Sequence, residues 1–157
     1  MSNMILSDKY KAFLRHNAKA EALEGTTAAG KTTVGAFKFM LKVAKSSKKL
    51  HFIASKSIGD AEKNIINSDL GIVDIFGELV DYRGNGSLDY KIPHLVYHVD
   101  NKPENDKIVF VLGYEDKTKW KKALVHNLVV VTLTKSTRLI QTLFKNQLCA
   151  VTIGCAP

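Results

Sequence analysis

The sequence has little cysteine and no long apolar run. Its two cysteines, Cys149 and Cys155, have no metal-ligand spacing with any histidine, so neither a disulfide framework nor a zinc site is expected. No apolar run approaches the roughly 18 residues that a membrane helix needs. The first residues lack the basic and then apolar pattern of a secretory signal. These absences favour a cytoplasmic protein with free thiols.

Acidic residues are outnumbered by basic ones. The chain has 23 Lys and Arg against 15 Asp and Glu, which gives a formal net charge of +8. A basic surface suits a polyanionic partner such as nucleic acid. The alternative is a solvated lysine-rich face without a ligand, and charge alone favours that alternative. Four lysines near the end of one predicted helix also complement the helix dipole: Lys42, Lys45, Lys48 and Lys49.

Three segments have helical patterns. Residues 6–19 are predicted to form a helix capped by Ser7. Residues 31–44 are predicted to form an amphipathic helix, which the serines at 46 and 47 end. Its expected apolar stripe consists of Val34, Phe37, Leu41 and Ala44. A third helix is predicted to begin at Ser57 or Asp60 and to end near residue 67.

Strand-like runs lie between and after these helices. They are expected at residues 19–24, 50–54, 95–99 and 108–113, and a β-branched run at 128–133 is a further strand candidate. Residues 83–87 have turn chemistry, and the polar stretch around Pro103 suits a hairpin loop. Residues 71–80 fit no pattern, and residues 115–124 are predicted to be a lysine-rich helix around Trp120. This order predicts an α/β layered fold with a mainly parallel sheet.

One motif has the spacing of a phosphate-binding loop. Residues 25–32 read Gly25-Thr26-Thr27-Ala28-Ala29-Gly30-Lys31-Thr32, which fits G-x-x-x-x-G-K-[ST] at every fixed position. The glycines let the backbone point N–H groups at a β-phosphate, and the next helix directs its positive end there. Lys31 is predicted to bind the β- and γ-phosphates of ATP, Thr32 to ligate Mg²⁺, and Thr33 to add a phosphate contact. A chance glycine-rich turn is the alternative, but a predicted strand precedes the motif and a predicted helix follows it.

The five histidines do not suggest a metal site. His94 and His98 are four residues apart on a predicted strand rather than on a helix, and no H-E-x-x-H motif is present. We expect them to be core or surface residues.

The wider sequence resembles tailed-phage terminase large subunits. Residues 24–35 are similar to the family's Glu-Gly-Thr-Thr, two small or basic residues, then Gly-Lys-Thr-Thr. Gly113-Tyr114-Glu115-Asp116, followed by Trp120-Lys121-Lys122, resembles the segment before the family's acidic strand. The resemblance covers about residues 10–124. One departure is Ala28, because many terminases have an arginine near this point that contacts the γ-phosphate.

The resemblance implies a DNA-packaging ATPase of phage or prophage origin in the host cell cytoplasm. It implies an incomplete RecA-like (ASCE) P-loop NTPase fold, and ATP hydrolysis that drives double-stranded DNA into a procapsid in the full protein. The implied partners are DNA, the small terminase subunit and the portal ring. The family's nuclease domain is absent from the 157 residues. Two alternatives stay open: another DNA-dependent P-loop ATPase of helicase-like type, or a non-catalytic nucleotide- or DNA-binding module.

The acidic pair of such an ATPase is missing. The chemistry needs an apolar strand ending in Asp-Glu, where the Asp assists Mg²⁺ and the Glu activates water. No acidic residue follows Asp116 in this sequence. No catalytic residue is therefore assigned, and the chain is expected to be inactive alone.

We interpret residues 1–124 as part of the ATPase domain and residues 125–157 as an out-of-frame tail. When the last base of each codon is read with the first two of the next, residues 131–140 permit Tyr-Ile-Asp-Glu-Ile-Asn-Thr-Ala-Asp. In the same frame, residues 124–128 permit Gly-Thr-Gln-Phe. The alternative is a native, divergent C-terminus. In that case the catalytic carboxylates must be sought in a partner chain or among Glu104, Asp106, Glu115 and Asp116.

Overall fold

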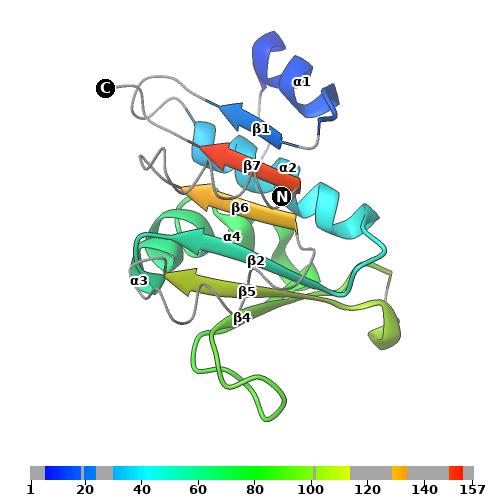
Figure 1. Cartoon of the computed structure of the whole chain (residues 1–157), viewed down its shortest axis with the longest axis vertical. Helices are drawn as coiled ribbons and strands as arrows, with labels where there is room; N and C mark the ends of the chain where they lie inside the picture. The colour runs from blue at the N-terminus through cyan, green and yellow to red at the C-terminus, as the bar shows by residue number, and fades with distance from the viewer. Residues whose placement is uncertain are drawn as a thin grey trace.

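One seven-stranded sheet organises the part of the chain that this computed structural model describes, residues 6–18, 20–23, 30–100, 102–113, 129–133 and 149–153. The strands run in the order β1-β7-β6-β2-β5-β4-β3 (Figure 1). Their bounds are β1 Ala20–Leu23, β2 Leu50–Ser55, β3 Val80–Arg83, β4 His94–Tyr97, β5 Lys107–Gly113, β6 Val129–Leu133 and β7 Cys149–Ile153. Every strand predicted within these residues is therefore present.

The sheet has a parallel part and an antiparallel part. The strands from β1 to β5 pair in parallel, and Phe52 of β2 lies opposite Phe110 of β5 and Val130 of β6. β4 pairs antiparallel with both β5 and β3, so the hairpin expected around Pro103 is confirmed. The result is a mixed α/β fold with a partly parallel sheet. The further antiparallel strand, β3, was not predicted, because residues 71–80, which lead into β3, have no clear pattern.

Short helical segments accompany one long helix. Their bounds are α1 Asp8–Arg15, α2 Lys31–Lys45, α3 Ile58–Ala61, the π-helix η1 Glu62–Ile66, α4 Ile72–Phe76, and the 3-10 segments η2 Gly77–Leu79 and η3 Pro103–Asn105. Ser7 and Ser57 cap α1 and α3 as predicted, each accepting a hydrogen bond from a backbone N–H. The predicted helix at 115–124 lies outside the described residues. No helix in the described ranges is long and apolar enough to cross a membrane.

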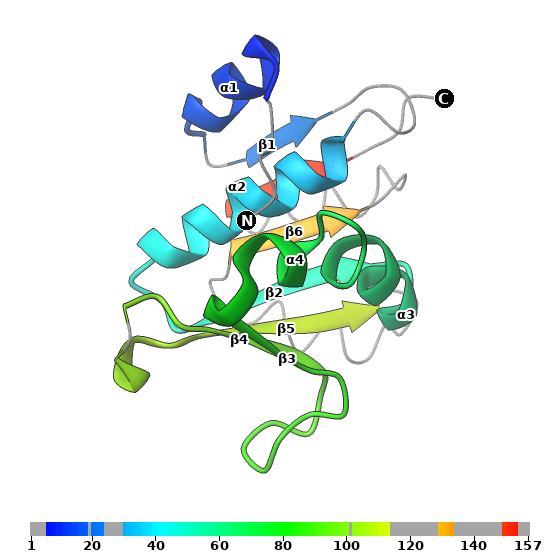
Figure 2. The same ribbon diagram turned by 180° about the vertical axis from the view of Figure 1, so that it is seen from behind.

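The core lies between the sheet and the helices on one of its faces. Figure 2 shows α2, α3 and α4 on this face. Alternate strand residues point toward the helices, including Ile53, Leu95 and Val109, and all three are fully buried. They belong to one cluster with Phe39 and Met40 of α2. The long helix is thus fixed along its length against the sheet.

Two details of the predicted helices were wrong. α1 ends at Arg15 rather than residue 19, because the next residues are extended and His16 and Ala18 contact Glu21. The stripe predicted for α2 is only partly right: Val34 is buried, but the other buried apolar residues are Ala36, Phe39, Met40 and Val43, whereas Leu41 is 37% exposed. α2 is apolar on most sides, so the pattern did not distinguish the sheet-facing side. Phe37 instead stacks on Phe76 of α4, with 5.8 Å between ring centroids.

Candidate functional site

The N-terminus of α2 is built differently from those of α1 and α3. Its cap is Gly30, whose φ of 71° lies in the left-handed region that favours glycine. Gly30 has no side chain that could cap the helix, none of the described side chains is seen to cap it, and its first turn contains no acidic residue. The first N–H groups of a helix have no partner within it. With neither a capping side chain nor a carboxylate, the amides of this first turn suit an external anion.

Lys31 occupies the first helical position and is only 6% exposed. A cation at a helix N-terminus opposes the helix dipole. A negatively charged ligand reverses this effect, because both the lysine and the dipole then attract it. Thr32 and Thr33 follow Lys31 and are half-buried. The other predicted loop residues, Gly25, Thr26, Thr27, Ala28 and Ala29, lie outside the described residues.

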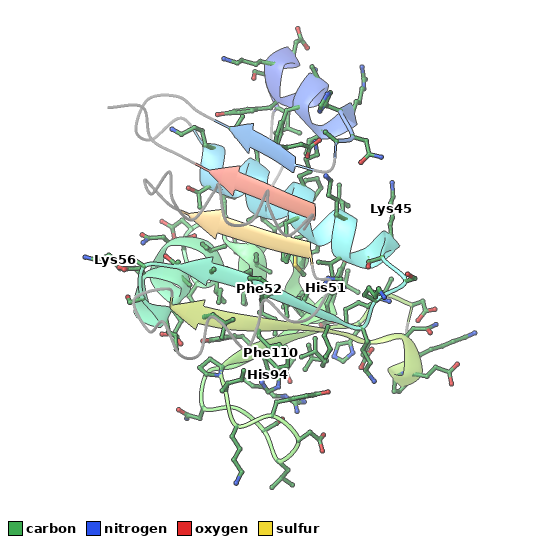
Figure 3. The ribbon with its side chains drawn as sticks, in the orientation of Figure 1. Lys45, His51, Phe52, Lys56, His94 and Phe110 are labelled. Atoms are coloured by element: carbon green, nitrogen blue, oxygen red, sulfur yellow. The ribbon has the colours of Figure 1, made fainter. Side chains whose placement is uncertain are left out.

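The N-terminus of α2 lies at the edge where the parallel strands end. β1 leads toward this edge and α2 runs back from it (Figure 1). The carboxyl ends of β2, β5, β6 and β7 share the same edge, because these strands are parallel to β1 through successive pairings. Open α/β sheets bind ligands at this edge. In Figure 3, Lys56 follows β2 at the edge where the parallel strands end. Lys45, at the end of α2, lies toward the opposite edge, where these strands begin.

The Asp-Glu pair expected of an ATPase is not found at the carboxyl end of any described parallel strand. Asp60, which follows β2 at this edge, accepts a hydrogen bond of 2.9 Å from the Ser57 hydroxyl. None of the five parallel strands ends on an acidic residue. Glu104 and Asp106 precede β5 and so lie at the opposite edge of the sheet, which excludes them as partners of Lys31. Glu115 and Asp116 follow the carboxyl end of β5 but lie outside the described residues.

A buried ion cluster connects the strand before the loop with the helix after it. The Glu21 side chain is 3% exposed, and its Oε2 lies 2.8 Å from Lys38 Nζ and 3.0 Å from Lys42 Nζ. Its Oε1 accepts a hydrogen bond of 3.1 Å from the Ala18 N–H and lies 3.1 Å from His16 Nδ1. Lys38 Nζ also donates to the carbonyls of Phe13 and His16. The cluster joins α1, β1 and α2 through one carboxylate.

The cations determine the ionisation of Glu21. Burial alone raises its pKa, but hydrogen bonds from Lys38 and Lys42, with smaller contributions from Ala18 and His16, lower the pKa to about 2. The carboxylate is therefore charged at neutral pH. This cluster was not predicted, because nothing in the spacing of Glu21 and the two lysines shows that β1 passes beside α2.

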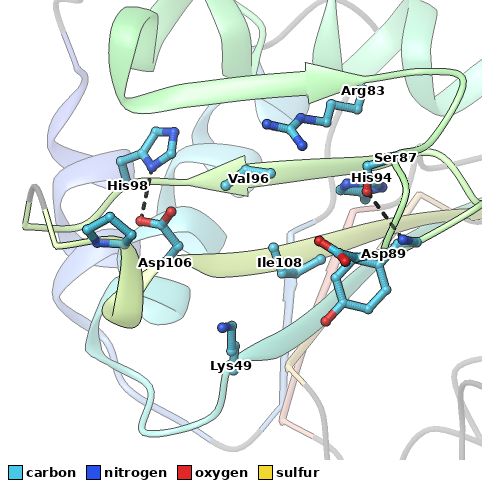
Figure 4. A pocket seen from close by; sticks show the side chains of 11 residues that line it. Lys49, Arg83, Ser87, Asp89, His94, Val96, His98, Asp106 and Ile108 are labelled. Atoms are coloured by element: carbon cyan, nitrogen blue, oxygen red, sulfur yellow. Dashed lines mark hydrogen bonds and ion pairs between the residues drawn. The ribbon is translucent and has the colours of Figure 1, made fainter.

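His94 and His98 both contact neighbouring residues of the protein. His94 is 1% exposed, its Nδ1 donates to the Ile92 carbonyl at 2.7 Å, and its ring packs edge-on against Tyr90. His98 Nδ1 lies 3.0 Å from Asp106 Oδ1. Both line a hollow over β3, β4 and β5 that mixes Lys49 and Arg83 with acidic side chains (Figure 4). Within the described ranges, no group of three or more His, Cys, Asp or Glu could hold a metal ion.

The fold is similar to that of large terminases. No protein-family model and no curated protein matches the sequence. A structure of the large terminase from a thermophilic bacteriophage matches 98% of this chain and 40% of that chain, with a TM-score of 0.68 and 15% identity. A structure of the same terminase in complex with ATP-γ-S matches 96% of this chain and 38% of that chain, with a TM-score of 0.64 and 14% identity. This chain thus spans less than half of the terminases it matches.

These matches confirm the resemblance at the level of the fold. The structural match covers 98% of the chain, which is more than the residues 10–124 over which the sequence resembles the family. The backbone of β6 lies beside β2, so the strand predicted at 128–133 is confirmed. The position of β6 does not decide the reading frame of the tail, because an apolar β-branched run forms a strand whichever frame encodes it.

Proposed function

We propose that this chain is the nucleotide-binding part of the ATPase domain of a terminase-like DNA-packaging motor, with an incomplete RecA-like P-loop fold. The observation that carries the proposal is the uncapped N-terminus of α2, with Gly30 at a positive φ and Lys31 buried beside it, at the edge where the parallel strands end. In the full protein, ATP hydrolysis would drive double-stranded DNA into a capsid. The small terminase subunit and the portal ring would be its partners.

The residues present fit a nucleotide. In this proposal Gly25, Gly30 and the intervening backbone surround the β-phosphate, while Lys31 holds the β- and γ-phosphate oxygens. The Thr32 hydroxyl would ligate Mg²⁺, which neutralises phosphate charge when bound. Thr33 would add a phosphate contact. The sequence supplies this binding half of the site, but none of the described parallel strands ends in an Asp-Glu pair that could activate water, so binding without appreciable hydrolysis is expected.

Replacing Lys31 tests the binding site. We expect Lys31→Met to weaken the binding of Mg-ATP or Mg-ADP at least about tenfold, because a hydrogen bond to a charged group contributes roughly 1.5–3 kcal/mol. Titration with a fluorescent ADP analogue measures this. Lys45→Met, at the other end of the same helix, is the matched control and should bind like the parent chain. Equal affinity of the Lys31 variant and the parent chain would contradict the assignment.

We further propose that residues 125–157 are translated out of frame. The chain has no acid after Asp116, yet the alternative frame permits Tyr-Ile-Asp-Glu across residues 131–135. That segment begins within β6, which spans Val129–Leu133, and continues two residues beyond its end. A carboxylate pair encoded there would follow a strand of the parallel part of the sheet, at the same edge as Lys31.

The nucleotide sequence of the gene tests the frame. Read from the codon of Trp120 to about a kilobase past the stop, the alternative frame should encode Tyr-Ile-Asp-Glu and continue open into a nuclease-like region. A closed or unrelated alternative frame would mean that the tail is native. The carboxylates would then have to come from Glu115, Asp116 or a partner chain.

A further inference from the structure

The positive charge of this chain is concentrated near its N-terminus. Residues 1–49 contain ten Lys and Arg but only three Asp and Glu. Residues 51–157 contain 13 Lys and Arg and 12 Asp and Glu. Nearly all of the net charge of +8 therefore belongs to the first third of the chain. An even spread would be expected of lysines that serve only solubility, so this asymmetry indicates a polyanionic partner for one region.

The fold gathers part of this charge around one hollow between α1 and the second half of α2. The residues that line it are Leu14, Arg15, His16, Asn17, Lys38, Leu41, Lys42 and Lys45. None of these is acidic in the described structure. Arg15 and Lys45 are exposed, and the Lys42 side chain is 15% exposed. Lys42 Nζ lies 3.0 Å from Glu21 Oε2 and donates to the Ala18 carbonyl at 3.1 Å, so the hollow presents mainly Arg15 and Lys45 to a ligand.

The buried cluster beneath the hollow separates structural from accessible charge. Lys38 donates to two carbonyls and pairs with Glu21 at 2.8 Å, so its ammonium is fully used within the protein. Glu21 carries one negative charge against the two positive charges of Lys38 and Lys42. The cluster therefore remains net positive, and Arg15 and Lys45 at the rim add to it.

The chemistry of the lining favours a phosphodiester backbone. Single-stranded nucleic acids are commonly bound by aromatic side chains on which the bases stack. The described lining contains no Phe, Tyr or Trp. Cations without stacking surfaces bind the backbone of a duplex independently of its sequence.

We propose that the hollow between α1 and α2 is a docking site for the phosphate backbone of double-stranded nucleic acid. The proposal rests on the proposed function only for the choice of DNA as the probe. Lys42 and Lys45 follow Lys31 by 11 and 14 positions along α2, which is roughly 16 Å and 21 Å along the helix. Nucleotide and DNA would thus bind near opposite ends of one helix, so the two sites can be tested separately.

The test is DNA binding by the double variant Arg15→Gln, Lys45→Gln of the full chain. With a fluorescent duplex of about 30 base pairs at low salt, we expect at least a tenfold loss of affinity. We also expect the slope of log affinity against log salt concentration to fall by about two, since each phosphate contact contributes about 0.9. Lys91→Gln, Lys102→Gln removes the same charge from exposed positions outside the hollow and should keep the parent affinity and slope.

Three outcomes would overturn the proposal. They are no binding of the duplex by the parent chain at low salt, an equal loss in the control variant, or tighter binding to vesicles with about 30% phosphatidylserine than to the duplex. Fluorescent ADP titration of the same variants separates this proposal from the proposed function. Unchanged ADP affinity with lost DNA affinity supports the docking site, whereas absent ADP binding in the parent chain contradicts the proposed function alone.

Discussion

The chain should bind ATP without turning it over, and restoring the alternative frame should raise the rate by at least about 100-fold. General-base catalysis alone contributes roughly 10²–10⁴-fold, and the restored Asp-Glu pair would also balance the charge of Mg²⁺. The measurement compares phosphate release by this chain and by a chain whose gene is frame-corrected after residue 124. A corrected chain with glutamine in place of the restored glutamate is the control.

The control distinguishes chemistry from folding. It should bind nucleotide like the corrected chain but release phosphate at the low rate of the present chain. If the present chain turns over ATP as fast as the frame-corrected chain, then it does not lack the catalytic carboxylates, and the proposal of an out-of-frame tail is wrong. Glu115 and Asp116 would then be the residues to replace.

Replacing Glu21 should cause a large loss of stability. Glu21→Leu leaves the buried Lys38 and the partly exposed Lys42 without their carboxylate, and breaking a buried ion pair in this way costs about 3–5 kcal/mol. Urea denaturation at neutral pH measures this. The triple variant Glu21→Leu, Lys38→Met, Lys42→Met removes the whole ion cluster and should recover most of the loss, because apolar replacement of a buried ion pair is often nearly neutral.

The same carboxylate predicts a pH dependence. Its pKa is about 2 in the folded chain and 4.5 in the unfolded one, so the unfolded state binds protons first as the pH falls. The stabilisation is present in full above pH 4.5 and is lost as the pH falls from 4.5 toward 2, by roughly 3 kcal/mol. The Glu21→Leu variant should lack this part of the acid sensitivity. A parent chain whose stability is flat from about pH 5 to about pH 3 would contradict the ion cluster.

Local features of the sequence were predicted well, because their causes are local. Ser7 and Ser57 are good helix caps, and both helices begin where these residues predict. The loop motif predicted a strand before it and a helix after it, and β1 and α2 occupy those places. The strand at 128–133 followed from a β-branched run alone.

Features that depend on distant segments were not predicted. The Glu21 ion cluster requires β1 and α2 to be neighbours, and no periodicity shows that. The buried side of α2 is decided by what packs on it, so the stripe through Leu41 was wrong. The antiparallel β3 was missed because residues 71–80 divide among α4, η2 and the start of β3, each too short for a pattern.

The most direct test of the nucleotide site is a backbone NMR titration of the chain with Mg-ADP. The account predicts that the amide resonances of Gly30, Lys31, Thr32 and Thr33 shift strongly, while those at the amino end of β2, such as His51, stay in place. Saturable shifts confined to the first turn of α2 and the preceding loop would support phosphate binding there. Unshifted amides at residues 30–33 in millimolar Mg-ADP, or shifts only in another part of the chain, would contradict it.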